Sequence, residues 1–330
     1  MKKVLVCGET LIDLLPQGSG SPEESLWRGR SAGGPLNSAV ALARLGRSVG
    51  LVTRLGADAF AAQLGAFIVE QGIDATAVVH SNDATPLAIV SLDDEGKASY
   101  VFHFTGTAAF GWKPDELPEP DPGTWLHLAS LGWVVEPGAT VLREWLSRTA
   151  SQWGGLSYDI NVRPHVIPDP SAYWRLVRPI VETVGRAGGV IKASDDDLAF
   201  LAPAIASTIP GTLPYDEQDP SAAARTIAEH WARAHNTTVV VTLGADGSLA
   251  ATSESTIFCP PVAVNVVDTV GAGDAFMAGF LDSHLAGGSL EVALHHGAII
   301  AGLTCQQVGA NPPAAETVDD HLGNTQCSRC

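Results

Sequence analysis

The feature that most constrains the fold is an alternation of short apolar runs with helix-length segments near the start of the chain. Apolar runs at Val4 to Cys7 and Val49 to Thr53 alternate with helical patterns at Ala39 to Leu45 and Ala59 to Gln71. This order is typical of βαβ units, whose parallel strands are buried under helices on both faces. The sequence therefore predicts an α/β fold with a mostly parallel central sheet.

The same rhythm returns further along the chain. Core strands are predicted at Trp125 to Leu128, Gly155 to Tyr158, Gly189 to Lys192 and Thr238 to Leu243. Helical patterns such as Ala139 to Thr149 and Ala222 to Ala234 fall between several of them. The chain has 330 residues, of which 45% are hydrophobic, so it can form one large α/β domain or two ordinary ones.

Two segments interrupt this rhythm, at about residues 11–30 and 86–104. Each contains strand-like runs with a turn signal between them, and each could form a β-hairpin outside the main sheet. We expect them to form a small β lid that covers one edge of the sheet. Tyr100, Phe102 and Phe104 alternate along the second segment, which would place their rings on one face, as lid core or as substrate contacts.

The charge balance indicates the kind of partner. The net charge of −17, from 36 acidic and 19 basic residues, argues against binding to nucleic acid or anionic membranes. Small molecules or further copies of the chain are the expected partners. Five scattered cysteines do not describe a secreted disulfide framework, and no apolar stretch reaches the length of a membrane span. We therefore expect a cytoplasmic protein.

The strongest local signal is the glycine-rich run from Asn265 to Phe280. Gly271 and Gly273 open an apolar helix predicted over Ala272 to Leu285. Without Cβ atoms, these glycines let backbone N–H groups converge at the positive end of the helix, which favours a phosphate. Asp274 would lie beside that phosphate and could accept a proton from an attacking hydroxyl. An acid in a first helical turn can also simply stabilise the helix.

The run Asp-Thr-Val-Gly-Ala-Gly-Asp at 268–274 resembles the C-terminal signature of ribokinase-type (PfkB) sugar kinases. It is not a Walker P-loop, because GxxxxGK[ST] is absent. The resemblance implies that Gly271, Ala272 and Gly273 form an anion hole and that Asp274 is the general base. It also implies one ribokinase-like domain at 1–315, a three-layer α/β/α fold with a small β lid. We expect residues 316–330 to be a flexible tail.

Other blocks resemble the family in the same order and imply its sugar site. Gly8-Glu-Thr-Leu-Ile-Asp13 resembles the first strand and its sugar-binding acid, although Asp13 could be a turn residue. Ala32-Gly-Gly-Pro-Leu-Asn37 resembles the N-terminal signature, in which Gly33, Gly34 and Asn37 contact the sugar, although Asn also caps helices. Tyr158-Asp-Ile-Asn-Val-Arg-Pro164 resembles the DxNxRP strand end and implies that Asn161 and Arg163 bind substrate; a surface salt bridge is the alternative for Arg163. Phe104 is a further candidate sugar contact.

The resemblance also implies a nucleotide site. Lys192-Ala-Ser-Asp-Asp-Asp197 occupies the place of the family's Asn-x-x-Glu segment, with Ser194 replacing Asn and Asp197 replacing Glu. Asp197 would hold Mg²⁺ through water, while Asp195, Asp196 and an acidic helix start remain alternatives. The positions that match the family's nucleotide contacts are Thr242, Gly244, Gly247, Gly309 and Ala310. Asp268 corresponds to a monovalent-cation site in some relatives, so K⁺ is a candidate cofactor.

Together, these resemblances imply ATP- and Mg²⁺-dependent phosphorylation of a primary sugar hydroxyl. The first and third blocks look most like fructokinases, with 2-keto-3-deoxygluconate kinase and ribokinase as alternatives. An alternative from another functional class is a catalytically silent sugar or nucleotide sensor with the same fold. The interpretation as a dinucleotide-binding dehydrogenase is rejected, because no GxGxxG motif follows the first strand. The lid edge could also pair with a second copy, giving a homodimer.

Overall fold

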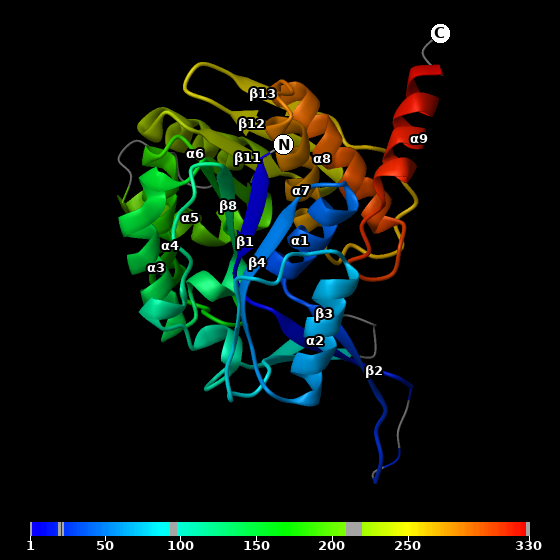
Figure 1. Cartoon of the computed structure of the whole chain (residues 1–330). Helices are drawn as coiled ribbons and strands as arrows, with labels where there is room; N and C mark the ends of the chain where they lie inside the picture. Colours follow the sequence, from blue (N-terminus) through cyan, green and yellow to red (C-terminus); the bar gives the residue numbers. More distant parts are fainter. Residues whose placement is uncertain (1, 19–20, 22, 93–97, 209–219, 328–330) are drawn as a thin grey trace.

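A computed structural model of the chain describes residues 2–18, 21, 23–92, 98–208 and 220–327 (Figure 1). Its centre is a nine-stranded sheet in the order β13-β12-β11-β10-β9-β8-β1-β4-β5. The strands from β5 to β11 pair in parallel, whereas β12 and β13 add an antiparallel edge. The strands are β1 Lys3–Cys7, β4 Val49–Leu55, β5 Val78–His80, β8 Thr124–Ala129, β9 Gly155–Asp159, β10 Val190–Ser194, β11 Thr238–Thr242, β12 Ser248–Ala251 and β13 Thr256–Cys259. The predicted mostly parallel sheet is confirmed.

Alternating side chains of each strand enter two separate cores. On β1, Leu5 and Cys7 join one cluster, whereas Val4 and Val6 join the other. This alternation follows from strand geometry, because successive side chains point to opposite faces. Both faces must then be covered by helices, which explains why the predicted strands are continuous apolar runs rather than alternating ones.

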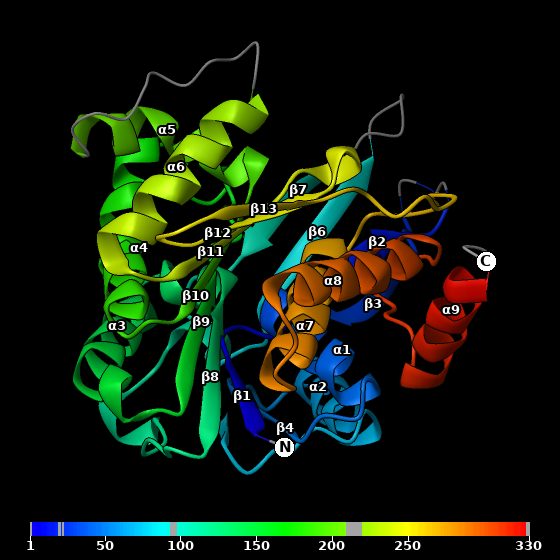
Figure 2. The same ribbon diagram turned by 90° about the horizontal axis from the view of Figure 1, so that it is seen from above.

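Helices cover the two faces of the sheet (Figure 2). One layer contains α3 Gly138–Thr149, α4 Pro170–Arg186, α5 Asp195–Thr208 and α6 Pro220–His235. The opposite layer contains α1 Gly34–Arg44, α2 Ala59–Glu70, α7 Ala272–Leu285 and α8 Leu290–Cys305. Short 3₁₀ segments are η1 Ala108–Phe110, η2 Pro114–Glu116, η3 Ser130–Trp133, η4 Ala150–Gln152 and η5 Gly244–Asp246. The three-layer α/β/α architecture is thus the predicted one.

The lid is a second, four-stranded sheet in the order β3-β2-β6-β7. Its strands are β2 Leu11–Pro16, β3 Trp27–Ala32, β6 Leu87–Leu92 and β7 Ala98–His103. The two predicted hairpins are present, β2 with β3 and β6 with β7, and β2 pairs with β6 in parallel to join them. The predicted turn at residues 93–96 lies outside the described residues. The lid follows β1 directly, so it begins at the carboxyl ends of the main strands.

The C-terminal segment differs from the prediction. Where a flexible tail was expected from residue 316, helix α9 spans Ala315–Cys327, and residues 328–330 lie outside the described part. The helix begins with backbone bonds from Thr317 and Val318 to the carbonyl of Ala314. Val318 is 2% exposed and packs in a small core with Ile299 and Ile300 of α8. A prediction based on the polar composition of this segment overlooks the burial of Val318.

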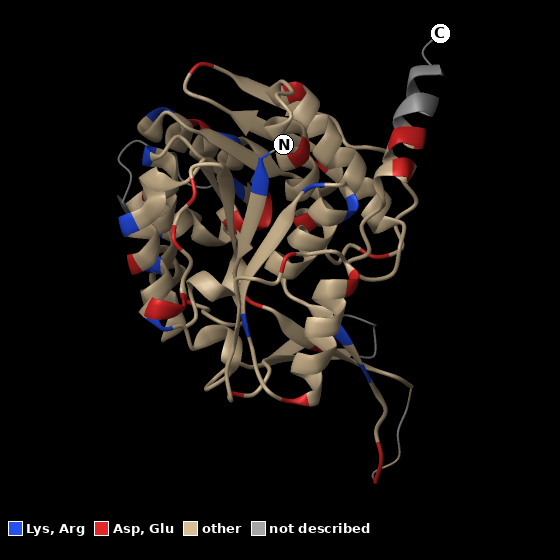
Figure 3. Cartoon of the chain, viewed as in Figure 1, with Lys and Arg blue, Asp and Glu red and all other residues tan. Residues whose placement is uncertain are grey.

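Charged residues are distributed over the whole fold (Figure 3). On the outer helices α4 and α6, Arg178 pairs with Glu182 and Arg225 pairs with Glu229, each at helical i,i+4 spacing. Within the described residues, we find no helix with the length and apolar character needed to cross a bilayer.

Candidate active site

A cavity of about 430 Å³ lies between the carboxyl ends of the central strands and the lid. Strands β1, β8 and β9 end at this edge, and the amino end of α7 faces them. Parallel strands bring their carboxyl ends together, which is where open α/β sheets bind ligands. The candidate residues that line the cavity are Asp13, Gly33, Gly34, Asn37, Asn161, Arg163, Gly271, Gly273 and Asp274. Residues far apart in the sequence therefore meet in one site.

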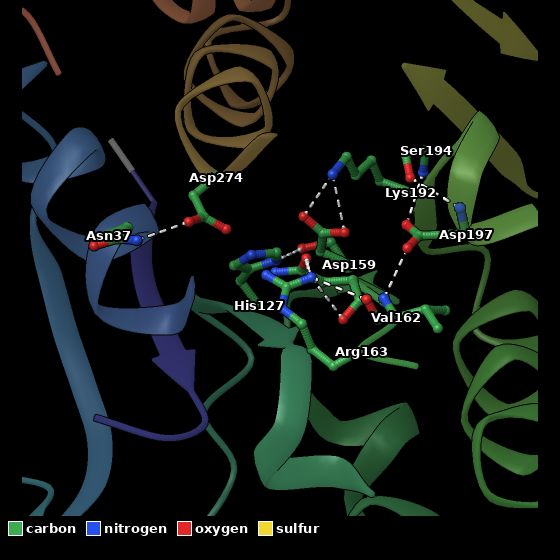
Figure 4. Close-up of polar contacts among 11 residues, drawn as sticks. Asn37, His127, Asp159, Val162, Arg163, Lys192, Ser194, Asp197 and Asp274 are labelled. Carbon is green, nitrogen blue, oxygen red and sulfur yellow. Dashed lines mark hydrogen bonds and ion pairs between the residues drawn. The ribbon is translucent and has the colours of Figure 1, made fainter. Parts of the chain in front are cut away.

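Asp274 is in the first turn of α7 and lines this cavity while being only 6% exposed. Its Oδ2 accepts a hydrogen bond of 2.9 Å from Nδ2 of Asn37, on α1 (Figure 4). Burial raises the pKa of the Asp274 carboxyl, while the Asn37 hydrogen bond and the charges of Lys192 and Arg163 oppose that rise. The carboxyl is therefore oriented and able to accept a proton.

The glycine-rich turn from Gly271 to Asp274 leaves little room for a side chain at its two glycine positions. Gly271 adopts a left-handed conformation (φ 77°), and a Cβ there would lie 2.4 Å from the Cβ of Ala310. A Cβ on Gly273 would lie 3.1 Å from Nζ of Lys192. The Ala272 amide donates to the carbonyl of Thr269, whereas the next amides, in the first turn of α7, have no acceptor within the helix. The turn thus fits an anion such as a terminal phosphate.

The paired glycines at the start of α1 form the opposite wall. Gly33 has φ 119°, and a Cβ there would lie 2.6 Å from the carbonyl oxygen of Glu9. A Cβ on Gly34 would meet Nδ2 of Asn161 at 2.9 Å and Oδ1 of Asp274 at 3.2 Å. Glycine is therefore required at 33 by its conformation, and at 34 because a methyl group would enter the site.

Asp13 is on lid strand β2 at the rim of the cavity. Burial raises the pKa of its carboxyl to about 6, although the charges of Arg163 and Arg30 oppose the rise. Arg30 is directly opposite Asp13 on β3. A half-buried carboxylate at this rim is suited to accept hydrogen bonds from sugar hydroxyls.

Arg163 follows β9 and lines the same cavity. Its Nη1 donates to the side chain of Asn161 and, at 3.0 Å, to the carbonyl of Val162. Asn161 itself has a positive φ of 47°. The guanidinium is therefore folded back on its own loop, with the rest of its donor fork available to an anion.

The nucleotide candidates lie farther along the same sheet edge. Ser194 and Thr242 are paired residues at the ends of neighbouring parallel strands β10 and β11. Gly244 begins the η5 turn that follows and Gly247 comes directly after it, and both have positive φ. Figure 4 places Ser194 on the far side of Lys192 from Asp274. In this view Lys192 thus lies between a predicted nucleotide contact and Asp274.

Gly309 and Ala310 line a second cavity of about 570 Å³ on the lid side. This cavity shares Asp13, Asn37 and Tyr100 with the first, so the two are contiguous. The amide of Gly309 donates to Oδ2 of Asp268 at 2.7 Å.

The two predicted metal-binding acids both bind backbone amides. Asp197 is 6% exposed, and its two oxygens accept hydrogen bonds from the amides of Val162 (2.7 Å) and Ser194 (2.8 Å). The oxygens of Asp268 accept from the amides of Val270 (3.0 Å) and Gly309 (2.7 Å). Within the described residues there is no cluster of three or more His, Cys, Asp or Glu side chains that could hold a metal. The donor set around Asp197 thus suits a loop anchor better than a metal ligand.

Comparison with known proteins assigns this site to a family. Residues 1–317 match the model of the pfkB family carbohydrate kinases. The chain belongs to this family. That match covers the strands, the glycine-rich turn and the lid together, so the chain is a carbohydrate kinase and not only a protein of similar fold.

Among individual relatives, fructokinase from Salmonella typhimurium is 29% identical over 287 residues, 87% of this chain and 85% of the relative. Aminoimidazole riboside kinase from Salmonella typhimurium (strain LT2) is 28% identical, covering 85% of this chain and 80% of the relative. A crystal structure of fructokinase from Vibrio cholerae O395 with fructose, ADP and calcium has a TM-score of 0.76. It is 26% identical, and the alignment covers 94% of each chain. A double mutant of that fructokinase has been solved with fructose, ADP and potassium.

This carbohydrate kinase also has a buried ion pair that the sequence analysis did not single out. Lys192 is 3% exposed, and its Nζ donates to the two carboxylate oxygens of Asp159 at 2.9 and 3.1 Å (Figure 4). Burial lowers the pKa of Lys192, but the charge and hydrogen bond of Asp159 and the charges of Asp197 and Asp274 together raise it more, so the ammonium stays charged. A lysine inside an otherwise apolar strand was the available signal.

The aromatic residues that line the kinase's cavity differ in part from the predicted ones. Tyr100 and Phe102 line the cavity, with ring centroids 5.9 Å apart. Phe104 is not among the lining residues; it is 8% exposed and packs on Phe110, with ring centroids 4.7 Å apart. Strand β7 ends at His103, so the chain turns there and carries the Phe104 ring into the main core. Phe104 as a sugar contact stays a prediction, and Tyr100 and Phe102 are the aromatic residues that line the cavity here.

The lining residues that were not predicted include Glu9, Ser130 and His165. Glu9 lies within the first matched block, but a strand-end acid has no distinctive spacing. Ser130 was hidden by its conformation, because it has a positive φ of 64° that no sequence pattern announces for a serine.

Proposed function

We propose that this carbohydrate kinase transfers the γ-phosphoryl group of ATP to a primary hydroxyl of a neutral sugar, with fructose as the preferred substrate. The observation that carries the proposal is that Asp274 lines one cavity together with the glycine-rich turn and with Asp13 and Asn37. An acceptor hydroxyl, a proton acceptor and a phosphate cradle can then meet at one point.

In the proposed reaction, the sugar hydroxyl oxygen attacks the γ-phosphorus in line. A new O–P bond forms, the bond to the bridging oxygen breaks, and ADP leaves. The proton of the hydroxyl passes to the carboxylate of Asp274, and the backbone amides of the glycine-rich turn stabilise negative charge on the transferred oxygens. Arg163 adds donors from the opposite side. Mg²⁺, when bound with ATP, would screen the phosphate charges, coordinated largely by phosphate and water oxygens.

The charges in the cavity support a neutral substrate. Three carboxyl groups line it, from Glu9, Asp13 and Asp274, against the guanidinium of Arg163. Carboxylates accept hydrogen bonds from hydroxyls but repel a substrate carboxylate or phosphate. This balance favours fructose or ribose over 2-keto-3-deoxygluconate, which is an acid. The fructokinases among the relatives support fructose as the first choice.

A riboside is the second candidate substrate. The contiguous 570 Å³ cavity beyond Asp13 and Tyr100 offers room for a group attached to the sugar, and one relative is an aminoimidazole riboside kinase. The deciding experiment is a panel of fructose, ribose, 2-keto-3-deoxygluconate and aminoimidazole riboside with ATP and Mg²⁺, read by ADP formation. We expect the highest kcat/KM for fructose. Sugar binding with no ADP formation from any compound would favour a sensor and overturn the proposal.

We also propose a cytoplasmic enzyme that forms a homodimer through the lid. Three cysteines, Cys7, Cys259 and Cys305, are free thiols, which suits a reducing compartment. The lid has two edge strands, β3 and β7, and Trp27 and Val101 on them are 42% and 55% exposed. Such edges tend to pair with another chain. Light scattering on the purified protein tests this, and a monomer at all concentrations would contradict it.

A further inference from the structure

Glu9 is a buried acid that lines the cavity and forms no ion pair among the described residues. It follows β1 and is 1% exposed, yet it is one of the residues that line the 430 Å³ cavity. Arg163 acts on it through its charge, but among the described residues no ion pair joins the two. Burying a carboxyl group without a charged partner costs stability. Such a cost is commonly tolerated where the group serves a ligand.

Two other buried acids differ from Glu9. Asp159 forms an ion pair with Lys192 inside the protein, and both oxygens of Asp197 accept hydrogen bonds from backbone amides. Neither acid is among the residues that line the 430 Å³ cavity. Oε2 of Glu9 accepts a 2.8 Å hydrogen bond from the amide of Gly132, and Glu9 is one of the lining residues. A carboxyl group has lone pairs for further hydrogen bonds, so a hydroxyl in the cavity can bind it as well.

The segment that anchors Glu9 is tightly constrained. A Cβ on Gly132 would lie 3.1 Å from the Cα of Gly8 and 3.2 Å from the amide nitrogen of Glu9. Ser130, which begins the same η3 turn, is held at φ 64°, a conformation that costs energy for a residue other than glycine. Its hydroxyl also hydrogen-bonds the Glu9 carboxyl. Strain of this kind is retained where the surrounding structure needs the side chain in one place.

The pair lies at the same end of the cavity as the proton acceptor. The point where a Cβ of Gly34 would stand is 3.4 Å from the Cβ of Ser130 and 3.2 Å from Oδ1 of Asp274. A sugar whose acceptor hydroxyl reaches Asp274 would therefore bring its neighbouring hydroxyls to Ser130 and Glu9.

We propose that Glu9, oriented by Gly132 and Ser130, binds a sugar hydroxyl next to the one that is phosphorylated and determines which sugars are accepted. This inference rests on the proposed sugar-kinase function of the site, but not on fructose being the substrate. The interaction suits a polyhydroxylated, uncharged sugar, since a carboxyl group can pair with a hydroxyl in either protonation state.

The protonation of Glu9 depends on groups from several elements. Burial raises its pKa to about 7, while hydrogen bonds from Gly132 and Ser130 and the charge of Arg163 oppose the rise. Cys7 on β1 and Tyr173 on α4 also interact electrostatically with Glu9. Burial raises the pKa of both groups, so they are neutral near pH 7. Asp13 and Asp274 share the cavity.

The test combines side-chain and substrate changes. For wild type, Glu9→Ala and Glu9→Gln, kcat/KM is measured with the best sugar of the panel and with its monodeoxy analogues that keep the acceptor hydroxyl. We expect wild type to lose roughly ten- to a hundredfold on one analogue, and Glu9→Ala to treat that analogue and the parent sugar alike. Glu9→Gln, which keeps the shape, should retain part of the discrimination. Glu119→Gln, an exposed acid, is the matched control and should behave as wild type.

The outcomes separate the hypotheses. If Glu9→Ala weakens all analogues and the parent sugar by one common factor, Glu9 only supports the fold and the inference is overturned. Melting temperatures of each variant accompany the kinetics, and Glu9→Gln decides the question should Glu9→Ala fail to fold. A preferred sugar other than fructose would change the analogue set without touching the inference. Absence of kinase activity in wild type would instead reject the proposed function itself.

Discussion

Nδ2 of Asn37 donates a 2.9 Å hydrogen bond to Oδ2 of Asp274 across 237 residues of sequence. This contact joins α1 to α7 at the wall of the sugar cavity. It fixes the orientation of a buried carboxyl and favours its charged form, because the donor stabilises the anion. In the proposed reaction, this contact links the predicted sugar-binding end of the site to the predicted phosphate-binding end through Asp274, the proposed proton acceptor.

Replacing Asp274 by Asn should lower kcat by about 10²- to 10⁴-fold, because the amide cannot accept the proton of the attacking hydroxyl. The shape of the side chain is kept, so the melting temperature should stay close to that of wild type. Steady-state ADP formation and thermal unfolding measure the two effects. Turnover at the wild-type rate would remove Asp274 from the mechanism.

Replacing Asn37 by Ala should move the acid limb of the kcat profile to higher pH. The Asn37 hydrogen bond lowers the pKa of Asp274. Without this bond, burial raises the pKa further, so on acidification the Asp274 carboxylate becomes protonated at a higher pH than in wild type. Activity should fall most at the acidic end. Ser38→Ala is the control, because this neighbouring hydroxyl is buried without a hydrogen-bond partner. Equal profiles for Asn37→Ala and Ser38→Ala would contradict the assignment.

Replacing Lys192 by Met should destabilise the protein by about 3–5 kcal/mol, because Asp159 would remain buried without its partner. Adding Asp159→Asn in the same chain should recover part of the loss, since the uncompensated charge is gone. Urea unfolding of wild type, both single variants and the double variant gives the coupling energy. Strictly additive losses of unfolding free energy would show that Lys192 and Asp159 do not stabilise the fold through their mutual interaction.

Replacing Gly34 by Ala should raise the sugar KM by roughly tenfold or more, since the methyl group would enter the space between Asn161 and Asp274 and displace the reacting groups. Stability should change little, because Gly34 opens α1 without a positive φ. Gly65→Ala in α2 is the matched control. Its methyl group would make an ordinary 3.7 Å contact and favour the helix by up to about 1 kcal/mol. An unchanged KM in Gly34→Ala would place the sugar elsewhere.

Replacing Glu9 by Gln should make stability less dependent on pH. The folded-state pKa of Glu9 is about 7, above its ordinary value of 4.5, so the folded protein binds more protons than the unfolded chain between these values. The unfolding free energy of wild type should therefore fall as pH rises through this window and level off above it. The advantage of Glu9→Gln over wild type should grow across the same window, on the order of 3 kcal/mol. Parallel curves for both proteins would contradict the raised pKa.

Much of the fold was predictable from the sequence because the strands are continuous apolar runs. Val49 to Leu55 are all buried, and such a strand differs clearly from the amphipathic helices around it. The glycine-rich turn was equally visible, since its two glycines mark positions where an added Cβ would clash with Ala310 or contact Lys192 tightly. These features depend on local sequence, and local patterns are what a single chain displays.

The missed features depend on contacts between distant segments. Glu9 reaches the amide of Gly132, and Lys192 pairs with Asp159 on a neighbouring strand. Asp197 was predicted to hold Mg²⁺ through water, and its hydrogen bonds to the amides of Val162 and Ser194 could not be foreseen from its position in the sequence. Helix α9 depends on Val318 finding a small core at α8. In each case the partner, and not the residue type, decides the role.

The glycine-rich turn has one more consequence, for the timing of synthesis. A Cβ on Gly271 would lie 2.4 Å from the Cβ of Ala310, so one wall of the turn comes from a segment that is synthesised after it. A growing polypeptide on the ribosome could display its lid and first glycine pair long before this contact exists. A nascent chain that ends before Ala310 should therefore consume no nucleotide.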